Sequence, residues 1–137
     1  MPANTAPIFS NVPHNEWAPV FTAANTAKDG TGTVNTVFTA NALNGSYLQK
    51  LIVRPLGTNV ASVLRVFLNN GATNATAANN VLIAELGLVA TTNTEVAAIA
   101  GYELPINLPL SPGDKINVTL GTAVAGGYAV SAHGGDY

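Results

Sequence analysis

The sequence contains no cysteine and unusually few charged residues. The absence of cysteine from all 137 residues excludes disulfide bonds, thiolate catalysis and zinc–thiolate sites. Charged residues make up 9 % of the chain, against roughly 25 % in an average soluble domain. The formal net charge is −2, so the chain has no positive field to hold the phosphates of DNA or RNA. We therefore expect no nucleic-acid binding.

Long apolar runs are also missing. No apolar run approaches the roughly 18 residues that a membrane-spanning helix needs, so we expect no membrane partner. Residues 1–7 have neither the cationic start nor the apolar centre of a secretory signal. We therefore expect synthesis in a cytoplasm.

The surface of a chain with so little charge must consist mainly of asparagine, threonine, serine and alanine. Two interpretations fit this composition. The surface is either neutral and insensitive to salt, or partly buried against other chains, because charge is depleted at interface cores. The two interpretations are compatible, and the sequence leaves both open.

Residues 1–30 differ from the rest of the chain because proline recurs every five or six residues. Proline fixes φ and removes a backbone donor, so neither a helix nor a central strand can run through this region. We expect an extended Pro-rich N-terminal arm over residues 1–30 and a single domain over residues 31–137. The arm either folds back on its own domain or lies over a neighbouring subunit. Its predicted partner-binding anchors are Ile8, Phe9, Trp17 and Phe21.

From residue 33 onward, segments with strand-like alternation recur at intervals of roughly 8 to 12 residues, with turn residues between them. This spacing predicts an all-β fold, a single-domain β-sandwich of jelly-roll type with seven or eight strands. A slip in the alternation near Gln49 and Lys50 predicts a β-bulge. Residues 91–100 fit either a short helical turn or an irregular crossing. The expected strands cover residues 33–39, 47–56, 60–68, 81–89, 102–110, 115–120 and 128–132.

Residues in phase within these strands form the predicted core. A one-residue slip in register would turn all the core residues of a strand towards solvent. The predicted core residues are Leu64, Val66, Leu82, Leu86, Leu88, Ile116, Val118 and Val130.

The residues that could carry chemistry are few. His14 lies near Glu16 in the arm, and His133 lies near Asp136 in a Gly-rich tail. Two ligands do not make a metal site, since catalytic and structural metals need three or four. Asp29, in an acidic Gly-rich turn, supplies too few oxygens for calcium. We therefore expect no catalytic residue, no cofactor and no metal, and no enzymatic activity.

The aromatic residues are spread over different strands. A sugar-binding platform would need two or three of them exposed together, and we expect each to pack in the core or at an interface instead. The residues concerned are Phe38, Tyr47, Phe67, Tyr102, Tyr128 and Tyr137.

Several segments follow one another in a recognisable order. They are residues 23–33 (AANTAKDGTGT), 38–40 (FTA), 56–65 (LGTNVASVLR), 67–71 (FLNNG), 102–105 (YELP) and 121–124 (GTAV). This ordered set resembles a family of small proteins encoded among the structural genes of tailed bacteriophages and prophages. The resemblance covers residues 5–137, and none of its segments is chemically specific.

The resemblance implies a virion structural protein, above all a capsid decoration (cement) protein with a β-sandwich fold. Its implied partners are the major capsid protein and further copies of itself, and analogy with other decoration proteins favours a homotrimer. The implied location is the capsid surface, after synthesis in the host bacterial cytoplasm. The resemblance transfers no catalytic residues. The alternatives are a tail or fibre-associated structural protein, a carbohydrate-binding module and a small hydrolase.

Overall fold

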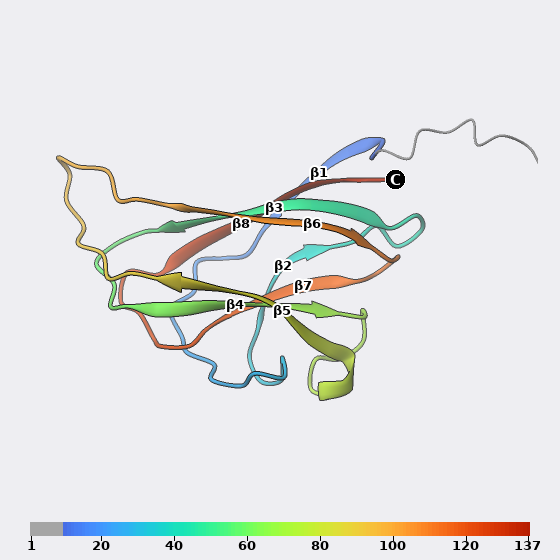
Figure 1. Ribbon diagram of the computed structural model, residues 1–137, viewed down its shortest axis with the longest axis horizontal. Coiled ribbons are helices and arrows are strands. Elements are labelled where there is room, and N and C mark those ends of the chain that lie inside the picture. Colours follow the sequence, from blue (N-terminus) through green and yellow to red (C-terminus); the bar gives the residue numbers. More distant parts are fainter. Residues whose placement is uncertain (1–9) are drawn as a thin grey trace, which may run out of the picture.

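The computed structural model describes residues 10–137, which form eight β-strands and one short 3₁₀ turn (Figure 1). The elements are β1 (Val12–Trp17), β2 (Asn35–Thr39), β3 (Ser46–Pro55), β4 (Ser62–Asn69), η1 (Ala77–Asn79), β5 (Asn80–Leu88), β6 (Tyr102–Leu110), β7 (Lys115–Leu120) and β8 (Tyr128–Asp136). The predicted all-β fold is confirmed. Within residues 10–137, no helix is long and apolar enough to cross a membrane.

The strands form two four-stranded antiparallel sheets. The first sheet has the order β1–β8–β3–β6, and the second has the order β2–β7–β4–β5. The sheets face each other (Figure 1), and buried side chains from both form one core cluster. The largest fully buried side chains of this shared core include Phe38, Leu48, Leu51, Leu64, Ile116, Leu120 and Tyr128.

Six of the eight predicted core residues are buried. Leu82 and Leu86 are only half-buried, and both lie on β5, an edge strand with a neighbour on one side. A register shift between Val66 and Phe67 places Leu82 opposite Phe67. The regular alternation assumed for β5 fails at this bulge.

The predicted bulge in β3 is confirmed. The register of β3 with both of its neighbours shifts between Leu48 and Lys50. Leu48 and Leu51 are both fully buried, although residues three apart on a regular strand point to opposite faces. The extra residue, Gln49, lets both leucines enter the core.

The expected boundary at residue 30 does not separate an arm from the sandwich, because β1 is a strand of the first sheet. All six of its residues pair with β8, from Val12 opposite Asp136 to Trp17 opposite Ser131. Pro13 is tolerated because β1 is an edge strand. The described part of the sandwich therefore begins with β1 rather than with residue 31.

The segment between β1 and β2 packs along the same domain. The backbone of Phe21 pairs with Tyr128, and Ala24 forms a parallel bridge to Leu120 of β7. The Asn25 side chain donates to the carbonyls of Thr31 and Thr33 at 2.9 and 2.8 Å. Of the two arrangements left open by the sequence, residues 10–34 adopt the one that folds back.

The last strand is longer than predicted. β8 continues to Asp136 rather than ending at Ala132. Glycine at position 134 makes this possible, because a Cβ there would overlap the carbonyl oxygen of Tyr47 on β3. The expected Gly-rich tail is thus a central strand of the first sheet.

Candidate functional site

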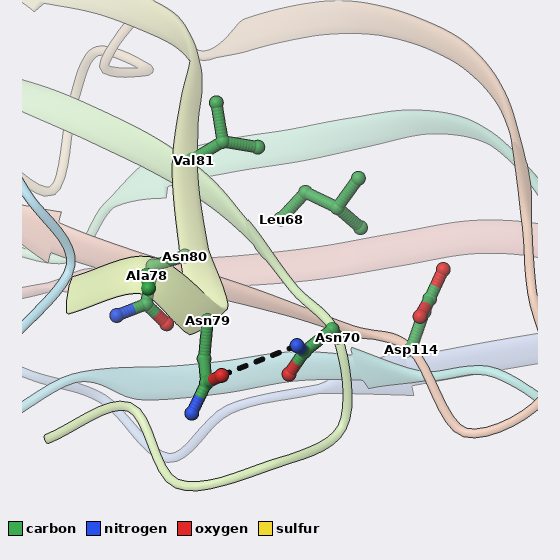
Figure 2. A pocket seen from close by; sticks show the side chains of 7 residues that line it. All are labelled: Leu68, Asn70, Ala78, Asn79, Asn80, Val81 and Asp114. Carbon is green, nitrogen blue, oxygen red and sulfur yellow. Dashed lines mark hydrogen bonds between the residues drawn. The ribbon is translucent and has the colours of Figure 1, made fainter. Parts of the chain in front are cut away.

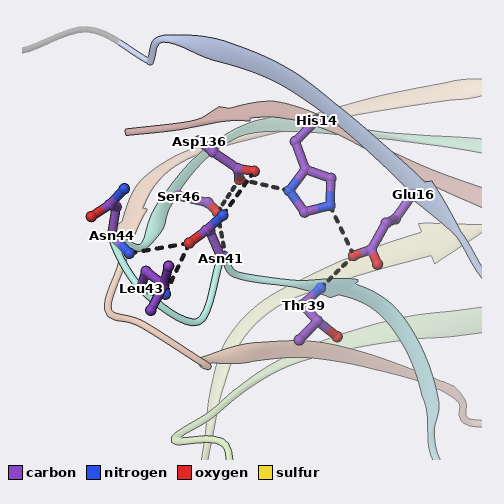
Figure 3. A network of polar contacts seen from close by, with 8 residues as sticks. All are labelled: His14, Glu16, Thr39, Asn41, Leu43, Asn44, Ser46 and Asp136. Carbon is purple, nitrogen blue, oxygen red and sulfur yellow. Dashed lines mark hydrogen bonds and ion pairs between the residues drawn. The ribbon is translucent and has the colours of Figure 1, made fainter.

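A network of polar side chains joins β1 to three other strands and to the β2–β3 loop (Figure 3). The His14 Nδ1 atom lies 2.7 Å from Oδ1 of Asp136, and the Ser46 hydroxyl donates to the same oxygen at 2.5 Å. On the other side of the ring, His14 Nε2 lies 3.6 Å from Oε2 of Glu16. That carboxylate accepts the Thr39 N–H at 2.5 Å.

This arrangement contains a serine, a histidine and an aspartate but is not organised for nucleophilic catalysis. A catalytic serine must bond to the histidine that removes its proton, whereas Ser46 bonds to Asp136. Ser46 is also fully buried, so its hydroxyl cannot reach a substrate. The network instead fastens the edge strand β1 to β2, β3 and β8.

The structure separates the two residues of the predicted C-terminal pair. On β8, His133 and Asp136 are three positions apart and point to opposite faces. His133 bonds to Asn15 and Ser131 at 2.9 Å each, while Asp136 points towards His14. Among residues 10–137, no group of three His, Asp or Glu side chains could hold a metal ion.

Two opposing effects act on the Asp136 carboxyl. Burial alone would raise its pKa, but hydrogen bonds from Ser46 and His14, with a contribution from Asn41, outweigh it and hold the pKa below its ordinary value. A carboxyl whose pKa is lowered by folding stabilises the protein above its unfolded pKa. That stabilisation is lost as the pH falls through the lowered value.

Replacing Asp136 by asparagine should therefore reduce the loss of folding free energy that accompanies a fall in pH. At neutral pH we expect Asp136→Asn to lower the free energy of unfolding by about 1.5 to 3 kcal/mol, because hydrogen bonds to a charged group are lost. Below about pH 4 the difference should shrink. Thermal unfolding between pH 2 and pH 7 measures this, with Glu103→Gln at an exposed ion pair as the control. An equal deficit at every pH would contradict the assignment.

The Asp29 turn is occupied by its own hydrogen bonds. The Oδ1 atom of Asp29 accepts from the hydroxyl of Thr31 at 2.6 Å and from its backbone N–H at 3.1 Å. The side-chain bond is the main reason that the pKa of Asp29 is lowered. This carboxylate closes a turn.

A shallow pocket of about 240 Å³ lies where β4 and β5 meet η1 (Figure 2). Its amide groups bond to one another and to the loop. Asn70 donates to the side chain of Asn79 at 3.2 Å, Asn79 donates to the Thr73 carbonyl at 2.8 Å, and Asn80 donates to the Asn74 carbonyl at 2.9 Å. These bonds hold the loop between β4 and β5 and leave few of its amide groups for a ligand.

The described aromatic side chains form no shared platform. Phe38, Phe67 and Tyr128 are fully buried, as expected, while Tyr47 and Tyr102 are half-buried on different strands. Trp17 differs from all of these, because it is 72 % exposed.

The predicted arm anchors have different environments. Trp17 lies at the end of β1 and is free to contact a partner. Phe21 is 7 % exposed, so its side chain belongs to the core of its own domain rather than to a partner-binding surface. Ile8 and Phe9 lie outside the described residues.

Sequence reasoning missed the most exposed apolar surface of the described chain. One end of the sandwich gathers residues 18–22 and the loops 56–61, 89–101 and 121–127, which we call the loop end. Ten large hydrophobic side chains are exposed among residues 10–137, and half of them lie here. They are Val20, Leu56, Val60, Val89 and Val96.

Asn59 holds the loop end together. Its side chain is 3 % exposed. It accepts from the backbone N–H groups of Gly126 and Gly127 at 2.7 and 3.0 Å and donates to the Gly127 carbonyl at 3.2 Å. Its backbone pairs in both directions with Thr91. Asn59 thus joins residues 56–61 to the 121–127 loop through its side chain and to the 89–101 loop through its backbone.

No protein-family model, no curated protein and no solved structure matches this chain. The geometry of the described residues therefore carries the functional argument. Within that geometry, the polar clusters serve the fold, whereas the loop end and Trp17 present apolar surface to the outside.

Proposed function

We propose that this protein is a bacteriophage virion structural protein, and specifically a capsid decoration (cement) protein that binds the major capsid protein and stabilises the head shell. The observation that carries the proposal is the exposure of Trp17 at the end of β1, together with the five exposed apolar side chains of the loop end. Tryptophan is enriched among the residues that dominate protein interfaces, and exposed apolar surface is typical of such sites. The resemblance of the ordered segments to small phage structural proteins supports the same role.

We also propose that the sandwich is a jelly roll. The strand orders β1–β8–β3–β6 and β2–β7–β4–β5 support this, since eight antiparallel strands shared between two sheets are typical of that fold. Consecutive strands change sheet along most of the chain, and only β4 and β5 form a hairpin within one sheet. Viral capsid domains commonly use this fold, although a fold by itself does not establish a function.

The proposal includes no enzymatic activity. The one cluster with serine, histidine and aspartate is engaged in fastening β1, and its serine is buried. A tail or fibre-associated protein remains the alternative within the same class, and a carbohydrate-binding module remains the alternative outside it. Immunolabelling of purified particles separates head from tail, and a glycan-binding screen tests the carbohydrate-binding alternative.

Trp17→Ala should weaken binding to head shells with little effect on folding. We expect a loss of about 30-fold or more in affinity, the size associated with removing a hot-spot tryptophan from an interface. Because the side chain is exposed, the free energy of unfolding should change by about 0.5 kcal/mol or less. Co-sedimentation with purified shells that lack this protein measures the affinity.

Val12→Ala is the matched control, because Val12 lies on the same strand and is 54 % exposed. It should bind like the wild type. Equal affinities for wild type and Trp17→Ala would remove Trp17 from the interface. Failure of the wild type itself to bind shells would overturn the decoration role.

A further inference from the structure

The outward faces of the two sheets differ in exposure. On the second sheet, Asn117 and Thr119 alternate along β7 with core residues and so point outward, yet they are only 3 % and 1 % exposed. The outward side chains of the first sheet remain accessible to solvent. We call this outward side of the first sheet the open face, and its central residues are Trp17, Lys50, Ile52, Arg54, Glu103 and Ser131.

The open face is one continuous surface, because its residues are neighbours in register. Trp17 lies opposite Ser131, Ser131 lies opposite Ile52, and Ile52 lies opposite Glu103. This row crosses all four strands of the sheet, a width of about 14 Å at roughly 4.8 Å for each strand spacing. A partner that contacts Trp17 therefore reaches the side chains of β3 and β6 as well.

The two permanent cations of the open face have different surroundings. Lys50 is neutralised within the face, since its Nζ atom lies 2.8 Å from Oε1 of Glu103. Arg54 has no ion-pair partner within 4.0 Å among residues 10–137. It donates from Nη2 to the Ile99 carbonyl at 3.3 Å. A guanidinium carries five N–H donors, so most of those of Arg54 are left for a partner.

Arg54 also borders a shallow pocket of about 220 Å³, whose other lining residues are Ile52, Gly101, Tyr102 and Glu103. Glycine at position 101 gives the guanidinium its place. A Cβ atom there would lie 2.5 Å from Nη1 of Arg54 and 2.7 Å from its Cδ. The pocket thus combines an unpaired cation with a hollow that admits a side chain of a partner.

The edges of the first sheet hinder the addition of a further strand. β1 carries Pro13, and β6 carries Pro105 and Pro109. Proline lacks the N–H group that pairing requires, and proline on an edge strand discourages association through that edge. We therefore expect a partner to contact the side chains of the open face rather than its backbone edges.

We infer that the open face takes an acidic segment of the major capsid protein. A carboxylate of that segment enters the pocket and pairs with Arg54, while an apolar side chain lies on Trp17. Arginine binds carboxylates through two parallel hydrogen bonds, and arginine and tryptophan are both enriched among the residues that dominate interfaces. The inference rests on the proposed function, to which it adds the chemistry of the partner.

Arg54→Glu tests the pairing, because it sets a negative charge against the carboxylate of the partner. In co-sedimentation with purified shells that lack this protein, we expect a loss of about 10-fold or more in affinity. Lys28→Glu is the matched control, since Lys28 is exposed outside the open face, and it should bind like the wild type. Arg54→Lys should keep part of the affinity, because the charge remains. Far-UV circular dichroism checks that each variant is folded.

Gly101→Ala tests the position of the guanidinium without changing any charge. The added methyl group must displace the end of the Arg54 side chain, so we expect a loss of about 3-fold or more in affinity for the same shells. Gly87→Ala is the matched control, because a Cβ atom at position 87 meets nothing within 4 Å. It should leave the affinity unchanged.

The outcomes separate the inference from the decoration role. If the wild type binds shells and Arg54→Glu binds equally well, or if Lys28→Glu loses as much affinity as Arg54→Glu, the inference is overturned and the decoration role stands. A wild type that binds no shells overturns both. Raising the salt concentration should also weaken the wild type more than Arg54→Gln, and an equal effect on the two would remove the ion pair from the contact.

Discussion

A chain that lacks residues 1–22 is expected not to fold. The deletion removes all of β1, whose six residues pair with β8. It also removes Ala18 and Phe21 from the core and leaves Asp136 without His14. The total stability of a domain is about 5 to 15 kcal/mol, so losing a strand, a buried aromatic ring and a buried polar network together should exceed it.

Far-UV circular dichroism and urea titration of the truncated chain measure this directly. A single substitution isolates the packing contribution: Phe21→Ala should lower the free energy of unfolding by about 3 to 5 kcal/mol, the usual cost of deleting a buried phenylalanine ring. Its neighbour Val20 is 53 % exposed, so Val20→Ala should cost much less. A truncated chain that unfolds cooperatively at the same urea concentration as the full chain would show that β1 is dispensable.

The sequence predicts most strands well because their apolar residues alternate. The β3 bulge was predictable as well, since the interruption at Gln49 is visible in the order of the residues themselves. β1 does not show this alternation of apolar residues. It places His14 and Glu16 inward, so its inner face is polar. The hydrogen-bonding groups of these two side chains pair with carboxylate, imidazole and backbone groups rather than packing against apolar side chains. Pro13 also argues against a strand in the sequence, because proline is rare within strands.

The candidate surfaces could not be derived in the same way, because exposure depends on which strands become neighbours. Trp17 and Phe21 are both aromatic residues of the predicted arm, yet the first is exposed and the second is buried under its own chain. The partners His14 and Asp136 are separated by 122 positions. The loop end needs three loops to meet, and only the assembled sheets bring them together.

Replacing Asn59 by alanine is expected to cause the largest loss of stability among substitutions of polar side chains. The buried amide of Asn59 serves two N–H groups and one carbonyl of Gly126 and Gly127. Each buried backbone group left without a partner costs about 1 to 3 kcal/mol. We expect Asn59→Ala to lower the free energy of unfolding by about 3 kcal/mol, which corresponds to a fall of roughly 10 °C in the midpoint of thermal unfolding.

Asn93→Ala is the matched control, because Asn93 lies on the same loop end but is exposed. It should change the free energy of unfolding by about 0.5 kcal/mol or less. Hydrogen exchange adds a local measurement: the amides of Gly126 and Gly127 should exchange faster in Asn59→Ala, while those of the central strand β3 follow only the global loss of stability. If the two variants were equally stable, the buried Asn59 amide would not be what holds the 121–127 loop to residues 56–61.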